Sequence, residues 1–126
     1  FQKWVQERIS DCKHYEDGEE VAFRKFFTVM AITNLITIGL YSNEEIIAFG
    51  TIEMLGGEYA QSHFGKTHIS KRGLNAYLMQ EVAAFLISNG IRSFNFTEDN
   101  GSESLRTGKE RFRPAFFLKK YSVSLI

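Results

Sequence analysis

The hydrophobic pattern divides the chain into a first part that is typical of helices and a second part that begins with a pattern typical of β-strands. In residues 1–12 apolar side chains recur at helical spacing, and a second amphipathic helix is predicted from Asp17 to about Asn34. From Leu35 onward, β-rich runs over 35–41 and 46–55 flank the polar tetrapeptide Ser42-Asn43-Glu44-Glu45. Two such runs around a short polar segment predict a β-hairpin.

The rest of the chain alternates between predicted helices and predicted strands. The clearest helix covers 71–89, where apolar side chains recur three and four residues apart and Asn89-Gly90 provides a stop. Ser102 is placed to cap a later, shorter helix. The remaining predicted elements are a strand over 58–64 after a Gly56-Gly57 turn, a strand over 91–97, a helix over 102–112 and a last strand over 115–126.

The resulting order is α-α-β-β-β-α-β-α-β. Hairpin-linked strands are antiparallel, whereas the later strand–helix–strand step can be parallel with a right-handed crossover. We therefore predict an α+β (mixed α/β) fold with a central mixed sheet flanked by helices. This order resembles the GCN5-related acetyltransferase-like fold, in which the helix after the third strand carries the donor's pyrophosphate on its N-terminus.

The donor loop of that superfamily follows the pattern Arg/Gln-x-x-Gly-x-Gly/Ala, in which glycines let backbone amides approach phosphate. The matching segment here is Arg72-Gly73-Leu74-Asn75-Ala76-Tyr77. Arg72, Gly73 and Asn75 are the candidate donor-loop residues. Asn75 and Tyr77 stand where the pattern has small residues, which argues against coenzyme A as the donor. We expect Tyr77 to pack on the apolar face of its helix.

Composition excludes several classes of protein. The formal net charge is zero, so the whole chain is not a generic nucleic-acid binder, although residues 101–120 hold six bases against two acids. The single cysteine, Cys12, and three scattered histidines provide neither a disulfide nor a zinc site. No apolar run reaches the roughly 18 residues of a membrane span, so no integral membrane segment is expected. These features favour a cytoplasmic context.

One stretch resembles a known family. The segment FNFTEDNGSESLRTGKERFRPAFFLKKYSV, residues 94–123, has an acidic cluster, a glycine, Leu-Arg, a lysine three residues on, an aromatic residue, a proline and Leu-x-Lys-Tyr-x-Val. In this it resembles the phosphatidylglycerol lysyltransferase C-terminal domain family. Residues 63–96 are more weakly similar to that family and to the Fem-type peptidyltransferases.

This resemblance implies an activity and partners. Both relatives are built on acetyltransferase-like domains, often in tandem, and characterised members move an aminoacyl group from charged tRNA to an amine or hydroxyl on a lipid or peptide. We therefore expect residues 1–126 to form one acetyltransferase-like domain, the C-terminal half of a longer tandem protein with an N-terminal partner domain. Aminoacyl-tRNA is the expected co-substrate, and the protein could associate with a membrane through a lipid substrate.

The chemistry of such a site selects candidate residues. An aminoacyl ester is already activated, so the enzyme must hold its ammonium, orient the acceptor, take up a proton and stabilise an oxyanion. Glu98 and Asp99 follow a strand at the edge where open α/β sheets place ligands, and their carboxylates suit an ammonium. His63, at the end of the third strand, is the candidate base. The predicted catalytic residues are therefore His63, Glu98 and Asp99.

The predicted substrate-binding residues are mostly basic. Arg106 and Lys109 lie one turn apart on a predicted helix and suit a phosphate of tRNA or of a lipid head group. Asn100 and Lys119 complete this set. The alternative for each is structural: an acidic turn before a helix, a solvated helix face, a packed histidine, or a lysine that protects a strand edge.

Two further functions stay open at this point. The first is an acyl-coenzyme A-dependent N-acyltransferase, which phosphate-binding glycines would favour. The second is a non-catalytic half of a tandem protein that binds RNA or a phosphate head group through the basic helix. Replacing His63, Glu98 and Asp99 would leave binding intact in that case and would abolish transfer in the enzyme.

Overall fold

The structure is a computed structural model that describes residues 17–68 and 70–124. The helix predicted over 1–12 and Cys12 lie outside the described residues. The described elements are helix α2 (Asp17–Val29), a 3-10 turn (Met30–Ile32), strands β1 (Leu35–Ser42), β2 (Glu45–Met54) and β3 (Tyr59–Thr67), helix α3 (Leu74–Ser88), strand β4 (Ser93–Asn95) and helix α4 (Glu103–Glu110).

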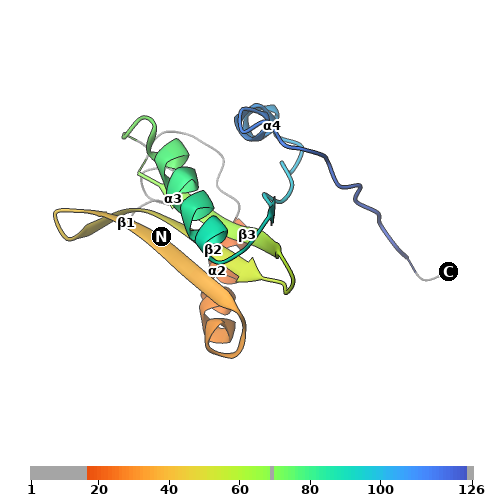
Figure 1. Cartoon of the computed structure of the whole chain (residues 1–126), viewed down its shortest axis with the longest axis horizontal. Coiled ribbons are helices and arrows are strands. Elements are labelled where there is room, and N and C mark those ends of the chain that lie inside the picture. Colours follow the sequence, from red (N-terminus) through yellow and green to blue (C-terminus); the bar gives the residue numbers. More distant parts are fainter. Residues whose placement is uncertain (1–16, 69, 125–126) are drawn as a thin grey trace.

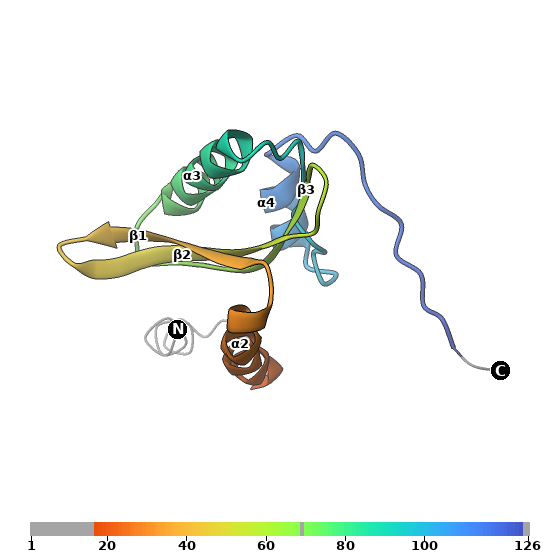
Figure 2. The same ribbon diagram turned by 60° about the horizontal axis from the view of Figure 1, so that its bottom comes forward.

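A four-stranded sheet in the order β1-β2-β3-β4 forms the centre of the molecule. The first two pairings are antiparallel, and β3 pairs with β4 in parallel. This confirms the predicted mixed sheet and its parallel strand–helix–strand step. Helix α3 covers one face of the sheet and α2 lies on the other (Figures 1 and 2).

The β1–β2 hairpin closes where the sequence predicts it. Ser42 pairs with Glu45, and the two residues between them, Asn43 and Glu44, have φ angles of 50° and 66°. A two-residue loop with positive φ at both positions matches the right-handed twist of the flanking strands. The loop therefore sets the register next to the turn, and an irregularity between Leu40 and Tyr41 shifts it by one residue further along the pair.

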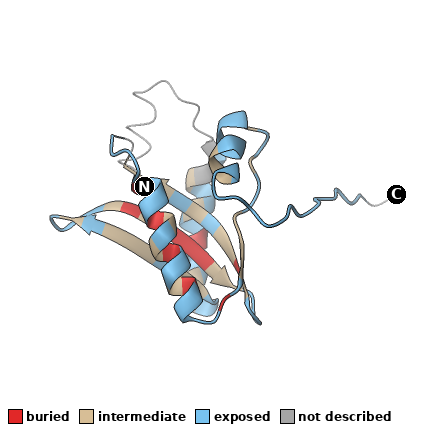
Figure 3. Cartoon of the chain, turned by 45° about the horizontal axis from the view of Figure 1, so that its top comes forward, coloured by how far each residue is buried: buried red, intermediate tan, exposed pale blue. Residues whose placement is uncertain are grey.

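The buried core lies between α3 and the sheet (Figure 3). One side of α3 contributes Leu74, Leu78, Val82 and Leu86, and the sheet contributes Ala48, Ile52 and Ala60. The four helix residues are spaced four apart, so they form one stripe along α3. Tyr77, which we expected in this stripe, is 51% exposed instead. Its position, between Leu74 and Leu78, turns it toward the edge of the apolar face.

The last predicted strand is not formed in the part of its range that is described. Residues 114–124 belong to no strand and are all exposed, and they run away from the sheet (Figures 1 and 2). A strand is stabilised by its ladder partner, and no described segment pairs with these residues. Among the described helices, none is both long and apolar enough to cross a bilayer.

Candidate functional site

An irregularity in β3 places His63. Gly50 pairs with Gly65 and Ile52 with Ser62, so two residues of β3, His63 and Phe64, oppose the single residue Thr51. This is a β-bulge, which breaks the alternation of side chains and re-aims one of them.

The buried side chain of Thr51 completes the hydrogen bonding at the bulge. Its hydroxyl accepts a hydrogen bond from the Phe64 amide at 2.9 Å and donates one to the Phe64 carbonyl at 3.3 Å. The hydroxyl therefore replaces the ladder partner that the bulge removes. Thr51 is fully buried, so the bulge is fixed inside the sheet rather than at its margin.

The bulge gives His63 two neighbours. Its Nε2 lies 2.8 Å from Oε2 of Glu53 on β2, and its ring lies 5.7 Å from that of Phe26 on α2. Phe26 also packs edge-on against Phe64, at 5.3 Å. Both consecutive β3 side chains thus contact the same ring on the α2 side of the sheet.

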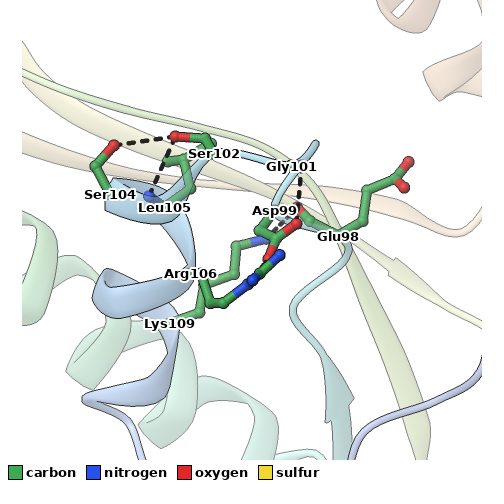
Figure 4. Close-up of polar contacts among 8 residues, drawn as sticks. All are labelled: Glu98, Asp99, Gly101, Ser102, Ser104, Leu105, Arg106 and Lys109. Atoms are coloured by element: carbon green, nitrogen blue, oxygen red, sulfur yellow. Dashed lines mark hydrogen bonds and ion pairs between the residues drawn. The ribbon is translucent and has the colours of Figure 1, made fainter.

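A second polar cluster follows β4. Asp99 accepts hydrogen bonds from Arg106 Nε at 2.6 Å and from the Gly101 amide at 2.9 Å (Figure 4). The hydrogen bond from Arg106, followed by that from Gly101, lowers the pKa of Asp99. In turn, the hydrogen bond to Asp99 raises the pKa of Arg106. Ser102 caps α4 by accepting a hydrogen bond from the Leu105 amide at 3.4 Å, which confirms the predicted cap.

Lys109 reaches back from α4 to the loop after β4. Its ammonium donates to the carbonyls of Phe96 and Glu98, both at 2.6 Å, and lies 3.4 Å from the Thr97 hydroxyl. It also lies 5.3 Å from the centre of the Phe96 ring. Burial lowers the pKa of Lys109, with Asp99 and Glu98 acting in the opposite direction. Because an ammonium has three protons, these contacts occupy its donors.

The loop that Lys109 holds is strained. Thr97 and Asn100 have φ angles of 58° and 50°, and Gly101 has one of 75°. A β-branched residue such as Thr97 rarely adopts positive φ. Strain of this kind persists only where the surroundings fix the backbone, and it is common at functional sites. Here Lys109 supplies part of that support, and the Asn95 side chain accepts a hydrogen bond from the Thr97 amide at 2.9 Å.

The other predicted binding residues are more exposed. Glu98 forms an ion pair with Lys120, and its carboxylate points away from the Asp99–Arg106 pair in Figure 4. Asn100 is exposed in the loop, and Lys119 is exposed in the C-terminal segment. Lys120, which we did not select as a site residue, is therefore the lysine of that segment that contacts the acidic cluster.

The predicted donor loop lies at the start of α3. Gly73 precedes the first helical residue with a φ of 78° and has no side-chain cap, and Arg72 and Asn75 are exposed beside it. A glycine is suited to this backbone conformation. Tyr77 lies in the first turn of α3, and a hydrogen bond to Glu81, one turn further along the helix, raises its pKa. Among the described residues, no hydrogen bond, ion pair or ring contact joins this loop to His63 or to the cluster after β4.

An apolar hollow of about 470 Å³ lies on the α2 side of the sheet, toward the β1–β2 hairpin. Its lining includes Phe23, Phe27, Tyr41 and Phe49, with Lys66 and His68 also contributing. Phe23 contacts Phe49 and Phe64, so aromatic rings continue from this hollow toward the bulge. In residues 17–68 and 70–124, no three His, Cys, Asp or Glu side chains are grouped to hold a metal ion.

The strand register relates His63 to the second cluster. Pairing between β3 and β4 ends at Gln61 and Asn95. His63 lies two residues after Gln61 on β3, and Glu98 lies three residues after Asn95 in the loop that follows β4. His63, predicted at the end of the third strand, lies inside it, because β3 continues to Thr67. Glu98 and Asp99 lie in the loop after β4, and among the described residues no hydrogen bond or ion pair joins them to His63. The structure leaves Arg72, Gly73 and Asn75 at the α3 N-terminus, in a separate loop.

Sequence reasoning missed Glu53, Thr51 and Phe26. Glu53 lies directly opposite Gln61, two residues before His63, so it is a diagonal neighbour of the histidine. An antiparallel register through the Gly56-Gly57 turn could have revealed that proximity. The bulge and its hydroxyl support have no sequence signature apart from Gly50 and Gly65.

Several solved structures similar to this chain are acetyltransferases of low sequence identity. An aminoglycoside acetyltransferase from an uncultured soil metagenomic sample, in complex with sisomicin, matches with a TM-score of 0.67 and 12% identity, covering 100% of this chain and 87% of that one. A ribosomal-protein-alanine N-acetyltransferase from Brucella melitensis biovar Abortus 2308 gives a TM-score of 0.60 and 14% identity, covering 73% and 72% of the two chains. An aminoglycoside 6'-N-acetyltransferase from Acinetobacter haemolyticus gives a TM-score of 0.61 and 13% identity, covering 99% of this chain and 90% of that one.

These likenesses confirm the predicted GCN5-related acetyltransferase-like fold and concern the fold alone. No curated protein matches the chain in sequence. The family described as "Phosphatidylglycerol lysyltransferase, C-terminal" matches residues 2–124, nearly the whole chain. This confirms the resemblance seen in the segment from Phe94 to Val123, and the chain belongs to the phosphatidylglycerol lysyltransferase C-terminal domain family.

Proposed function

We propose that this domain transfers an aminoacyl group from charged tRNA to an amine or hydroxyl of a lipid head group or peptide. The observation that carries the proposal is the end of the β3–β4 register at Gln61 and Asn95. Just beyond it, one strand bears an imidazole beside a carboxylate, and the other leads into a carboxylate–guanidinium cluster. Open α/β sheets bind ligands at such a point. Family membership supports a transferase.

Each half of the site supplies a different part of the reaction. His63 takes the proton of the attacking amine or hydroxyl, which bonds to the ester carbonyl carbon. The tetrahedral oxyanion then collapses, the bond to the ribose oxygen breaks, and that oxygen leaves as a hydroxyl with the proton returned by His63. Glu98 receives the ammonium of the donor amino acid.

Arg106 is the residue best placed to bind phosphate. It donates to Asp99 through Nε, and no described residue accepts a hydrogen bond from its two terminal amino groups. Those groups suit a phosphate, which guanidinium can bind in a bidentate manner. Lys109, whose donors are used within the loop, supports this site by holding the loop in place; direct substrate contact by Lys109, Lys119 or Asn100 stays a prediction.

The first experiment compares binding of the domain to lysyl-tRNA and to the same tRNA deacylated, over a range of salt concentrations. We expect tighter binding of the charged form, weakened by Glu98→Gln and by Arg106→Ala. Arg92→Ala is the matched control, because Arg92 is 80% exposed and pairs only loosely with Glu58, at 3.6 Å. Transfer is then followed with radiolabelled lysyl-tRNA and phosphatidylglycerol vesicles.

The other outcomes separate the alternatives. Equal, steeply salt-dependent binding of both tRNA forms would indicate a basic surface that binds phosphate only. Binding to neither form would remove tRNA from the proposal. A parallel titration with acetyl-coenzyme A tests the donor loop at Arg72, Gly73 and Asn75, and its binding would favour an acyl-coenzyme A-dependent acyltransferase.

A further inference from the structure

We propose that Glu53 is a positioning residue that fixes the tautomer of His63 and leaves Nδ1 as the proton acceptor of the transfer reaction. The role of Nδ1 in the reaction rests on the function proposed above. The fixed tautomer rests on the contacts of His63 alone.

The hydrogen-bond chemistry of the pair decides the tautomer. A neutral imidazole has one N–H donor and one acceptor nitrogen, whereas an ionised carboxylate only accepts. The 2.8 Å contact between His63 Nε2 and Glu53 Oε2 therefore requires the proton on Nε2. The His63 ring forms no other hydrogen bond with the described residues, so the lone pair of Nδ1 remains available.

The surroundings hold both partners without closing them off. Glu53 lies on β2 within the antiparallel register, and His63 lies in the bulge that the Thr51 hydroxyl supports. The Phe26 ring, which is buried, lies against the imidazole. The side chains of His63 and Glu53 are nevertheless 28% and 32% exposed. A group that is held by the sheet and still accessible to solvent can reach a substrate.

The pair also supports the proton transfer itself. When Nδ1 removes a proton from the acceptor, the ring becomes a cation, and the adjacent Glu53 carboxylate stabilises it. The ring then returns the same proton from Nδ1 to the departing ribose oxygen, so the imidazole is neutral again at the end. A carboxylate in this position orients the base and is not itself protonated.

The first test uses long-range proton–nitrogen NMR of the imidazoles in the full chain under mildly alkaline conditions. His63 is expected to show the Nε2-protonated tautomer. Glu53→Gln retains an oxygen acceptor and should keep this tautomer, whereas Glu53→Ala should give a mixture of the two. Glu58→Ala is the control, because that glutamate is 63% exposed and pairs with Arg92 instead. An Nδ1-protonated wild-type ring would overturn the proposal, whether or not the protein is a transferase.

The second test measures kcat for transfer from lysyl-tRNA to phosphatidylglycerol vesicles. A general base contributes about 10²–10⁴-fold, so we expect His63→Ala to lower kcat by that order and Glu53→Ala by about tenfold or more. Glu53→Gln should fall between Glu53→Ala and the wild type, because it restores orientation without the charge. The double variant should be no slower than His63→Ala, since Glu53 acts through His63.

The combined results separate the two proposals. Loss of activity in His63→Ala with unchanged kcat and tautomer in Glu53→Ala would overturn the role of Glu53 and leave the proposed function in place. Full activity in His63→Ala would overturn the role of Nδ1 as the proton acceptor even if the tautomer is as expected. No transfer by the wild type would overturn both the proposed function and that role.

Discussion

The two halves of the candidate site are held by different kinds of interaction. The His63 half lies on β3, within a sheet whose other face is covered by the buried stripe of α3. The Arg106 half lies on α4, in which no residue is buried. One half is therefore part of the cooperative core, and the other is attached to it by a few polar contacts and one ring contact.

Helix α4 shows how local those attachments are. Leu105 is 48% exposed and Phe112 46% exposed, and Phe112 meets the Phe96 ring at 5.6 Å. Within residues 17–68 and 70–124, the remaining support is the Lys109 ammonium and the Asp99–Arg106 pair. Elements with few buried apolar contacts open at a lower free energy than the core. We therefore expect the His63 half of the candidate site to be rigid and the Arg106 half to open and close while the sheet stays folded.

The largest effect is expected from Thr51→Val, which keeps the shape of the side chain and removes the hydroxyl at the bulge. Leaving the Phe64 amide and carbonyl without this buried partner should lower the free energy of unfolding by about 1–3 kcal/mol. Urea unfolding followed by circular dichroism measures the change. The same substitution on the other half, Thr107→Val, is the control, because Thr107 is exposed on α4.

Exposed substitutions away from special features usually change stability by less than about 0.5 kcal/mol. Thr107→Val should therefore leave the unfolding midpoint nearly unchanged. Equal destabilisation by the two valine variants would show that the His63 half is no more a part of the core than the Arg106 half.

The sheet and its helices could be predicted from sequence because their signals are local. The polar tetrapeptide from Ser42 to Glu45 predicts the hairpin, and the spacing of Leu74, Leu78 and Val82 predicts α3. The cap at Ser102 follows from the residue type and its place before a helix. Asp99 and Arg106 could be selected as candidate site residues from their charges and from the family resemblance, but the ion pair between them could not be predicted.

The contacts that organise the site could not be predicted, because they depend on register. The bulge changes which side of the sheet His63 faces, and one residue of slip would separate it from Glu53. The ammonium of Lys109 donates to backbone carbonyls. Because every residue has such a carbonyl, the sequence contains no signal that identifies these contacts. The prediction of a last strand was wrong over its described residues for a related reason. Residues 115–124 have the composition of a strand, but a strand also needs a pairing partner, which composition does not specify.

A smaller and local effect is expected from Lys109→Met, which keeps a long apolar stem and removes the ammonium. The carbonyls of Phe96 and Glu98 lose their donor, although relaxation of the strained Thr97 backbone offsets part of the loss. Since Lys109 is partly exposed, we expect a cost of about 1 kcal/mol.

Hydrogen exchange by mass spectrometry locates that effect. Amides of α4 and the loop before it should exchange faster in Lys109→Met, and those of α3 should not change. Lys119→Met is the matched control, because Lys119 is exposed in the C-terminal segment. Faster exchange in α3 as well would show that α4 belongs to the cooperative core.

The smallest effect concerns the pH dependence of the Asp99–Arg106 pair. The hydrogen bonds from Arg106 and Gly101 lower the pKa of Asp99 in the folded state, so the pair contributes its stability above the unfolded value of about 3.9 and loses it as the pH falls through the lower folded value. Carboxyl carbon NMR should give an Asp99 midpoint below that ordinary value, and Arg106→Gln should raise it. Because α4 is attached by few contacts, acid should release the Arg106 side chain before the sheet unfolds. An Asp99 midpoint at or above the ordinary value would mean that the ion pair does not hold α4 in solution.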